Sequence, residues 1–202
     1  YDANQIRYYQ YSNRGEKYDP ANDAIMQMYN NYFGGGMNAI VFQEMREARG
    51  LAYSAQAWLI SPSRKSNPYI MSAFIACQND KMVDAIEAFE DIINNMPESA
   101  NSFNIAKDAV LTDMRTARVV KDAIMWRYVA AQDMGLDYDR SRDIYEKIQT
   151  LTLDDVKAFQ QQWIKDRKYT FCVLGDLPNL DMKKLEEYGP VTVLSKEEIF
   201  GY

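Results

Sequence analysis

The chain has 202 residues, of which 47% are hydrophobic and 26% charged, and it contains two cysteines and no histidine. This length fits one large domain or at most two small ones, and the composition is that of a folded globular protein rather than a disordered chain. A formal net charge of −6 without a basic cluster argues against nucleic acid or an anionic membrane as the main partner.

The first part of the sequence predicts a strand and two helices. Residues 4–11 alternate and are rich in tyrosine, as expected of a strand with one buried face. Asp19 and Pro20 are the residue types preferred at a helix cap and at the first helical position. The apolar stripe that follows them runs up to three consecutive glycines, which end the helix. Residues 37–48 predict a second, short helix that ends at Gly50.

The middle of the chain predicts a hairpin followed by helices. Residues 51–60 and 69–77 read as antiparallel strands, because the segment between them is rich in proline, serine and asparagine. Residues 82–96 carry apolar residues at steps of three and four, which is the spacing of an amphipathic helix. Another helix is expected over residues 103–117. Residues 123–134 are more apolar around the helical circumference than the preceding helices, so we expect this helix to be more fully buried.

The last part of the chain predicts further helices and strands. Thr152 and Asp155 have the spacing of a capping box, which predicts a helix start at this point. A short helix, a buried strand, a final helix and a candidate edge strand are expected over residues 141–148, 169–174, 180–188 and 190–194.

These elements predict the α+β class, because the strands come in hairpins and the helices in runs. We expect one domain over residues 1–202, with a mostly antiparallel sheet of four to five strands and helices packed on one face. The sequence starts at Tyr1 rather than at a methionine, so we expect a fragment, a processed product or a trimmed form. No apolar run approaches the roughly 20 residues of a membrane span.

The two cysteines give little information on compartment. Cys77 and Cys172 both lie in apolar runs predicted to be strands, so we expect buried, unreactive thiols. A disulfide between them would need adjacent strands in a suitable register, which a sequence does not define. The redox compartment therefore stays open.

The absence of histidine excludes several kinds of site in this chain. No Ser-His-Asp or Cys-His relay can form, and neither can a zinc site that uses histidine. Two cysteines are too few for a four-cysteine zinc site. The three glycines do not make a phosphate loop, because Met37 and Asn38 follow them where lysine and serine or threonine are needed. We interpret them as a turn with positive backbone angles.

An acidic segment follows residue 132. A calcium loop starting at Asp137 would need glycine at position 142 and glutamate at position 148, where the chain has Arg142 and Ile148. We therefore interpret the segment as a solvated acidic loop.

Arg46 and Tyr53 lie seven residues apart, on either side of the bend expected at Gly50. Two polar groups placed across a bend can converge on one point, which makes them candidate site residues. Structural explanations are also available, because arginine is favoured in the last turn of a helix and tyrosine early in a strand.

Three segments around these residues resemble a known family. Residues 32–37, 42–47 and 49–54 read YFGGGM, FQEMRE and RGLAYS. They resemble the C-terminal-type domain of pitrilysin/insulinase-type zinc metallopeptidases, a superfamily that includes the mitochondrial processing peptidases. The likeness extends more loosely along the chain to the late strand that ends at Leu174.

The resemblance implies an α+β domain of the LuxS/mitochondrial processing peptidase-like metallohydrolase fold. In this family two or four such domains enclose a chamber, and an N-terminal-type domain holds zinc through an inverted histidine-glutamate motif that this sequence lacks. The family's arginine and tyrosine correspond to Arg46 and Tyr53, which implies that they bind substrate main chain and stabilise the tetrahedral intermediate. We thus expect no cofactor in this chain, zinc on a missing or partner domain, and an extended peptide substrate.

Two hypotheses remain open at this stage. In the first, the chain is the non-zinc-binding domain of a metallopeptidase, and its partners are other domains or a partner subunit of that enzyme. In the second, it belongs to a catalytically inactive relative that acts as a scaffold or interaction subunit. Under both, this chain alone is expected to be inactive, and the sequence preceding Tyr1 would decide between them.

Overall fold

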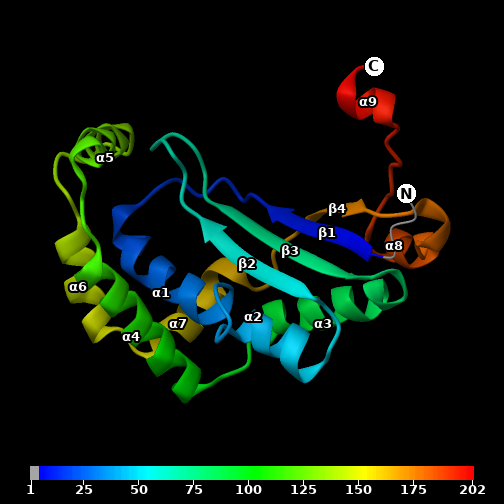
Figure 1. Ribbon diagram of the computed structural model, residues 1–202, viewed down its shortest axis with the longest axis horizontal. Helices are drawn as coiled ribbons and strands as arrows, with labels where there is room; N and C mark the ends of the chain where they lie inside the picture. The colour runs from blue at the N-terminus through cyan, green and yellow to red at the C-terminus, as the bar shows by residue number, and fades with distance from the viewer. Residues whose placement is uncertain (1–4) are drawn as a thin grey trace.

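The computed structural model describes residues 5–202 and shows one antiparallel sheet with helices packed against it (Figure 1). Its four strands are β1 (Gln5–Ser12), β2 (Ser54–Ile60), β3 (Ile70–Gln78) and β4 (Thr170–Leu174). Their order across the sheet is β2-β3-β1-β4, and every neighbouring pair is antiparallel. The predicted α+β class and sheet are therefore confirmed. Residues 1–4, which include the start of the predicted first strand and of the predicted domain, lie outside the described residues.

The strands alternate between a more buried and a more exposed face, most strictly along β1. Along β1, Ile6 and Tyr8 point into the core, whereas Tyr9 and Tyr11 point away from it. Strands β2 and β3 follow the same pattern, since successive side chains of a strand point to opposite faces. The outward face keeps large hydrophobic side chains that are more than one third exposed, namely Tyr9, Tyr11, Trp58, Ile60 and Leu174.

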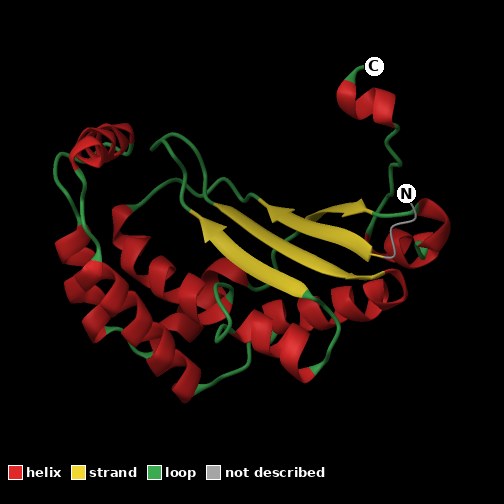
Figure 2. Ribbon diagram, in the orientation of Figure 1, coloured by secondary structure: helices red, strands yellow, loops and turns green. Residues whose placement is uncertain are grey.

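Most of the helices form a layer on the buried face of the sheet, whereas α5 (Lys121–Asp133) and α9 (Lys196–Phe200) stand away from it (Figure 2). Helices α1 (Asp23–Phe33) and α2 (Ile40–Phe42) contact β2, and α3 (Met82–Asn94) contacts β3. Helices α4 (Ala100–Thr116), α6 (Ser141–Thr150) and α7 (Leu153–Phe159) pack around α1. Fully buried aromatic side chains of α1 and α3 fill the space between the layers, namely Tyr29, Tyr32, Phe33 and Phe89. Helix α8 spans Met182–Tyr188, and the short turns are η1 (Pro20–Asn22), η2 (Gln43–Ala48), η3 (Asn79–Lys81), η4 (Gln160–Ile164) and η5 (Leu177–Asn179).

Both predicted helix starts are confirmed in detail. The Asp19 side chain accepts a hydrogen bond from the Ala21 N–H, and Pro20 begins the η1 turn that leads into α1. At α7, the Thr152 hydroxyl accepts from the Asp155 N–H, while the Asp155 carboxylate accepts from the Thr152 N–H at 2.8 Å. This reciprocal pair is the capping box that the sequence predicts.

Three predictions about burial and strand content are wrong. Helix α5 has no buried residue, although its apolar circumference predicted a core helix. Residues 190–194 do not pair with the sheet. Cys172 is exposed, because it occupies the outward face of the edge strand β4, whereas Cys77 is buried as predicted. Both cysteines are free. Among residues 5–202, no helix is both long enough and apolar enough to cross a bilayer.

Candidate functional site

The glycine turn between α1 and α2 packs directly against strand β2. A Cβ atom on Gly34 would lie 1.6 Å from the carbonyl oxygen of Ala57, and one on Gly35 would lie 2.2 Å from the Trp58 ring. Gly36 has a φ of +96°, which side-chain-bearing residues rarely adopt. The turn is therefore explained by close backbone approach at two glycines and by a positive φ at the third, so the predicted positive angle holds for Gly36 alone among them.

The segment that carries Arg46 is a π-helical turn rather than the continuous helix predicted over residues 37–48. Turn η2 follows α2 directly, and the Arg49 N–H donates back to the Glu44 carbonyl at 3.2 Å. The fully buried Met45 side chain anchors the turn in the core. Short π-helical insertions of this kind occur frequently at functional sites.

Gly50 then reverses the chain, as predicted, and brings Tyr53 back beside Arg46. Its φ is +58°, and the N–H groups of Leu51 and Ala52 both donate to the Met45 carbonyl. The Tyr53 N–H donates to the Ala76 carbonyl at 2.9 Å, which fixes the tyrosine at the beginning of the β2–β3 pair.

The structure places the side chains of Arg46 and Tyr53 in contact at the surface. The guanidinium carbon of Arg46 lies 5.0 Å from the centroid of the Phe42 ring and 5.4 Å from that of the Tyr53 ring. Both distances are within the range of cation–π attraction. Tyr53 is 74% exposed and the Arg46 side chain 44% exposed, so both polar ends are accessible to a ligand.

One acidic residue, Glu47, lies near Arg46 without neutralising it tightly. Arg46 Nε lies 3.6 Å from a carboxylate oxygen of Glu47, and both side chains are about half exposed. The neighbouring Arg49 lies at similar distances from Glu44 and Asp91. Exposed ion pairs of this length are weak and easily exchanged. Arg46 is therefore available to an anionic or carbonyl oxygen, whereas Arg49 is shared between two carboxylates.

The described part of the chain does not supply a metal centre. No group of three histidine, cysteine, aspartate or glutamate side chains among residues 5–202 is arranged to hold a metal ion. The residues present therefore do not fit zinc as ligands. What the site offers is two hydrogen-bond donors, a guanidinium and a phenol, that lie on either side of one bend.

Phe42 is the residue that sequence reasoning did not single out. It lies four positions before Arg46 and is half-buried, so it can support the guanidinium from the same helical face. The four-residue spacing of Phe42 and Arg46 could have indicated their contact. The π-helical turn that brings Tyr53 to the same guanidinium, however, leaves no recognisable pattern in the sequence.

Comparisons with known proteins agree on one family. The family model described as "Peptidase M16 inactive domain" matches residues 2–110. An uncharacterised zinc protease of Streptomyces coelicolor is 25% identical over 174 residues, which cover 80% of this chain and 35% of that protein. The chain thus spans about a third of the length of this relative.

Solved structures show the same fold. A peptidase M16 inactive domain from Pseudomonas fluorescens superposes with a TM-score of 0.70 at 18% identity, over 87% of this chain and 42% of that one. An inactive peptidase domain from Bordetella parapertussis gives a TM-score of 0.69 at 10% identity, over 87% of this chain and 93% of that one. At these identities the likeness establishes the architecture only.

Proposed function

Because this chain belongs to the peptidase M16 inactive domain family, we propose that it is the non-zinc-binding domain of a zinc metallopeptidase. In this proposal it helps to enclose the substrate chamber, and Arg46 and Tyr53 bind the peptide main chain and stabilise the oxyanion. The zinc itself is held by another domain of the polypeptide or by a partner subunit. The observation that carries the proposal is the contact between two exposed donors on one bend.

Two further observations support this assignment. The curated relatives are described as zinc proteases, whereas the described part of this chain has no metal-ligand group of its own. A complete site would therefore need residues from outside this chain. The outward face of the sheet is also exposed and hydrophobic, as one wall of a peptide-binding chamber would be.

The chemistry of the two side chains matches the proposed role. A bound zinc ion would polarise the scissile carbonyl and activate a water molecule. As the carbonyl becomes tetrahedral, its oxygen gains negative charge, and the Arg46 guanidinium and Tyr53 hydroxyl can donate hydrogen bonds to it or to the adjacent substrate carbonyls. Contact with two rings holds the guanidinium in place, so little reorganisation is needed when the charge develops.

The test is peptide cleavage by the full-length protein that contains this chain. Loss of one oxyanion donor reduces turnover by about 100- to 1000-fold in well-studied hydrolases, so Tyr53→Phe and Arg46→Ala should each reduce kcat to this extent. Zinc content and the unfolding midpoint should stay at the wild-type values. Arg49→Ala is the matched control, because it removes an exposed arginine three residues away and should leave cleavage nearly unchanged.

The second candidate is a catalytically inactive relative that acts as a scaffold or interaction subunit. The family description as an inactive domain is compatible with it. A full-length protein that lacks peptidase activity, or Tyr53→Phe and Arg46→Ala variants that cleave as fast as wild type, would favour this alternative and remove the catalytic role.

A further inference from the structure

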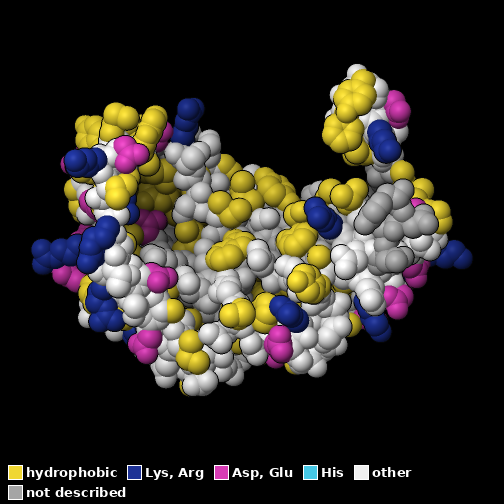
Figure 3. Space-filling view, viewed as in Figure 1, with side chains coloured by type: hydrophobic (Ala, Val, Ile, Leu, Met, Phe, Trp, Pro, Cys, Tyr) yellow, Lys and Arg dark blue, Asp and Glu magenta, His cyan; other side chains and the backbone are white. Residues whose placement is uncertain are grey.

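Helix α5 is the most exposed apolar element among the described residues. Five of its hydrophobic side chains are each at least 41% exposed, namely Ile124, Met125, Trp126, Tyr128 and Val129. Figure 3 shows hydrophobic side chains gathered over this helix, which stands apart from the body in Figure 1. A folded protein rarely leaves so many neighbouring apolar groups in water unless another surface covers them.

The apolar residues of α5 are not confined to one side. Successive helical residues are turned by about 100°, so the run from Ile124 to Trp126 alone covers most of the circumference. A helix that is apolar all round is normally buried on several sides. The exposed apolar side chains of α5 therefore need cover on more than one side, which a folded partner surface provides better than a single extended peptide.

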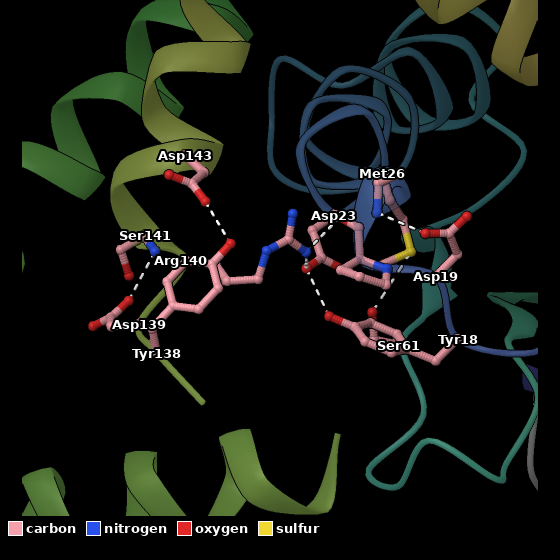
Figure 4. A network of polar contacts seen from close by, with 12 residues as sticks. Tyr18, Asp19, Asp23, Met26, Ser61, Tyr138, Asp139, Arg140, Ser141 and Asp143 are labelled. Atoms are coloured by element: carbon pink, nitrogen blue, oxygen red, sulfur yellow. Dashed lines mark hydrogen bonds and ion pairs between the residues drawn. The ribbon is translucent and has the colours of Figure 1, made fainter. Parts of the chain in front are cut away.

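The C-terminal end of α5 is hydrogen-bonded to the rest of the domain, which fixes the position of the helix. The Lys65 N–H donates to the Asp133 carbonyl at 3.0 Å, where the helix ends beside the β2–β3 loop. Just beyond, Arg140 donates to the Asp23 carboxylate at 2.7 Å, and both side chains are largely buried. Figure 4 shows Arg140 reaching across to Asp23, which also accepts a hydrogen bond from Tyr18.

A groove lies along the helix on the side of the turn that follows it. It has a volume of about 510 Å³ and is lined largely by hydrophobic side chains, including Val119, Ile124, Tyr128, Leu136 and Tyr138. The ion pair between Arg127 and Asp139 provides a polar rim beside it. An apolar centre with a charged rim is the usual anatomy of a protein interface.

We propose that α5 and this groove are the docking surface for another folded part of the same polypeptide, the part that holds the zinc. The chain spans only 35% of its Streptomyces coelicolor relative, so most of that protein lies outside the matched region. Interfaces between parts that stay associated permanently are more hydrophobic than interfaces that open and close, because the apolar surface of a permanent interface is never exposed to water. The identity of the partner as the zinc-bearing part rests on the proposed function, whereas the burial of α5 does not.

The test is hydroxyl-radical footprinting of the full-length polypeptide without added peptide. Trp126 and Tyr128 should react at least about fivefold more slowly than their exposure in this chain predicts, because they would lie in the centre of an interface. Tyr202, which is 87% exposed and belongs neither to α5 nor to the groove, is the internal reference and should react as an exposed tyrosine.

A pair of matched variants makes the test specific. Ile124→Asp places a charge on α5, and Ile105→Asp places the same charge on an exposed isoleucine of α4. Ile124→Asp should raise the reactivity of Trp126 and Tyr128 to that of free side chains and lower the unfolding midpoint, whereas Ile105→Asp should do neither. Circular dichroism and zinc content show whether each variant is folded.

Three outcomes would overturn the inference. Full reactivity of Trp126 and Tyr128 in the full-length protein would mean that nothing covers α5. Protection that disappears on dilution would assign the surface to a second copy of the chain, and protection that requires added peptide would assign it to substrate. If α5 is protected but Tyr53→Phe and Arg46→Ala cleave normally, the docking surface stands and the proposed catalytic role fails.

Discussion

Arg46 illustrates how one side chain is prepared for binding without being buried. Two aromatic rings contact its guanidinium, and the nearest carboxylate is 3.6 Å away. Cation–π contacts at exposed sites contribute about 0.5–1 kcal/mol, which is enough to favour one orientation but leaves the N–H groups free. Among residues 5–202 no ring is in cation–π contact with the neighbouring Arg49, which lies between two carboxylates, so the two arginines differ in availability although both are exposed.

Glu90 is a second residue whose environment leads to a testable prediction, here about the pH dependence of stability. Its carboxylate accepts a hydrogen bond from Gln10 between the sheet and α3, and burial raises its pKa above the ordinary value of 4.5. The folded state thus holds this proton to a higher pH than the unfolded state does. The contribution of Glu90 to stability therefore falls as pH rises from 4.5 through the folded-state pKa.

Replacing Glu90 by glutamine should consequently stabilise the protein at pH 7, by about 1 kcal/mol or less. The gain should shrink as pH falls and vanish below pH 4.5, where the wild-type carboxyl is protonated in both states. Denaturant unfolding at several pH values measures this difference. Glu87→Gln, on the exposed side of the same helix, removes the same charge and should show no such gain. An equal gain in both variants would assign the effect to net charge instead.

At the scale of elements, the glycine turn is the part of the site most sensitive to substitution. Gly34→Ala would force a methyl group onto the backbone of β2, and neither backbone can move without shifting the sheet edge. We expect a loss of about 3 kcal/mol or more in the free energy of unfolding. Gly35→Ala should be milder, because it meets the partly exposed Trp58 side chain, which can rotate.

Gly15→Ala serves as the control for this prediction. Unlike Gly34, Gly15 has a positive φ, of +78°, and apart from its chain neighbours no atom of the described residues lies within 4 Å of the position that its Cβ would occupy. Only the left-handed backbone penalty of about 1–2 kcal/mol should then apply. Thermal and denaturant unfolding of the three variants would rank them, and a Gly34→Ala protein as stable as Gly15→Ala would contradict the close approach deduced here.

These elements can be predicted from the sequence where neighbouring residues determine the structure, and not where distant contacts determine it. Caps are local, so Asp19 and Thr152 identify their helix starts correctly. The alternation along β1 also reports its two faces, because side-chain direction in a strand depends only on position. The π-helical turn at Arg46 could not be predicted, since the extra residue in the turn depends on how Met45 packs in the core.

The predictions for α5 and for residues 190–194 are wrong for a different reason. The apolar residues of these segments predict burial or strand pairing, and within the described residues nothing covers the helix. A pattern of apolar residues indicates that a surface is buried, but it does not indicate which part of the protein buries it. If α5 docks onto another folded part, as inferred above, the burial predicted for it would be found only in a protein that includes that part as well as these 202 residues.

At the scale of the whole molecule, the proposal that zinc is held outside this chain leads to a prediction about the two cysteines. The sequence has no histidine, and its only thiols are Cys77 and Cys172. They lie on opposite faces of the sheet, one buried and one exposed, and opposite different residues of β1. Burial raises the pKa of the Cys77 thiol to about 11, so the thiolate that zinc requires is disfavoured there.

Replacing both cysteines by alanine in the full-length protein should therefore leave its zinc content and peptide cleavage unchanged. Only a loss of about 1 kcal/mol in stability is expected, from the smaller side chain at the buried position 77. Elemental analysis and a cleavage assay on the folded variant provide the check. Because the chain has no other thiol and no histidine, loss of stoichiometric zinc from this variant would mean that the chain itself contributes to the metal centre. Arg46 and Tyr53 would then have to be reconsidered as neighbours of that centre rather than as donors that face it from a separate domain.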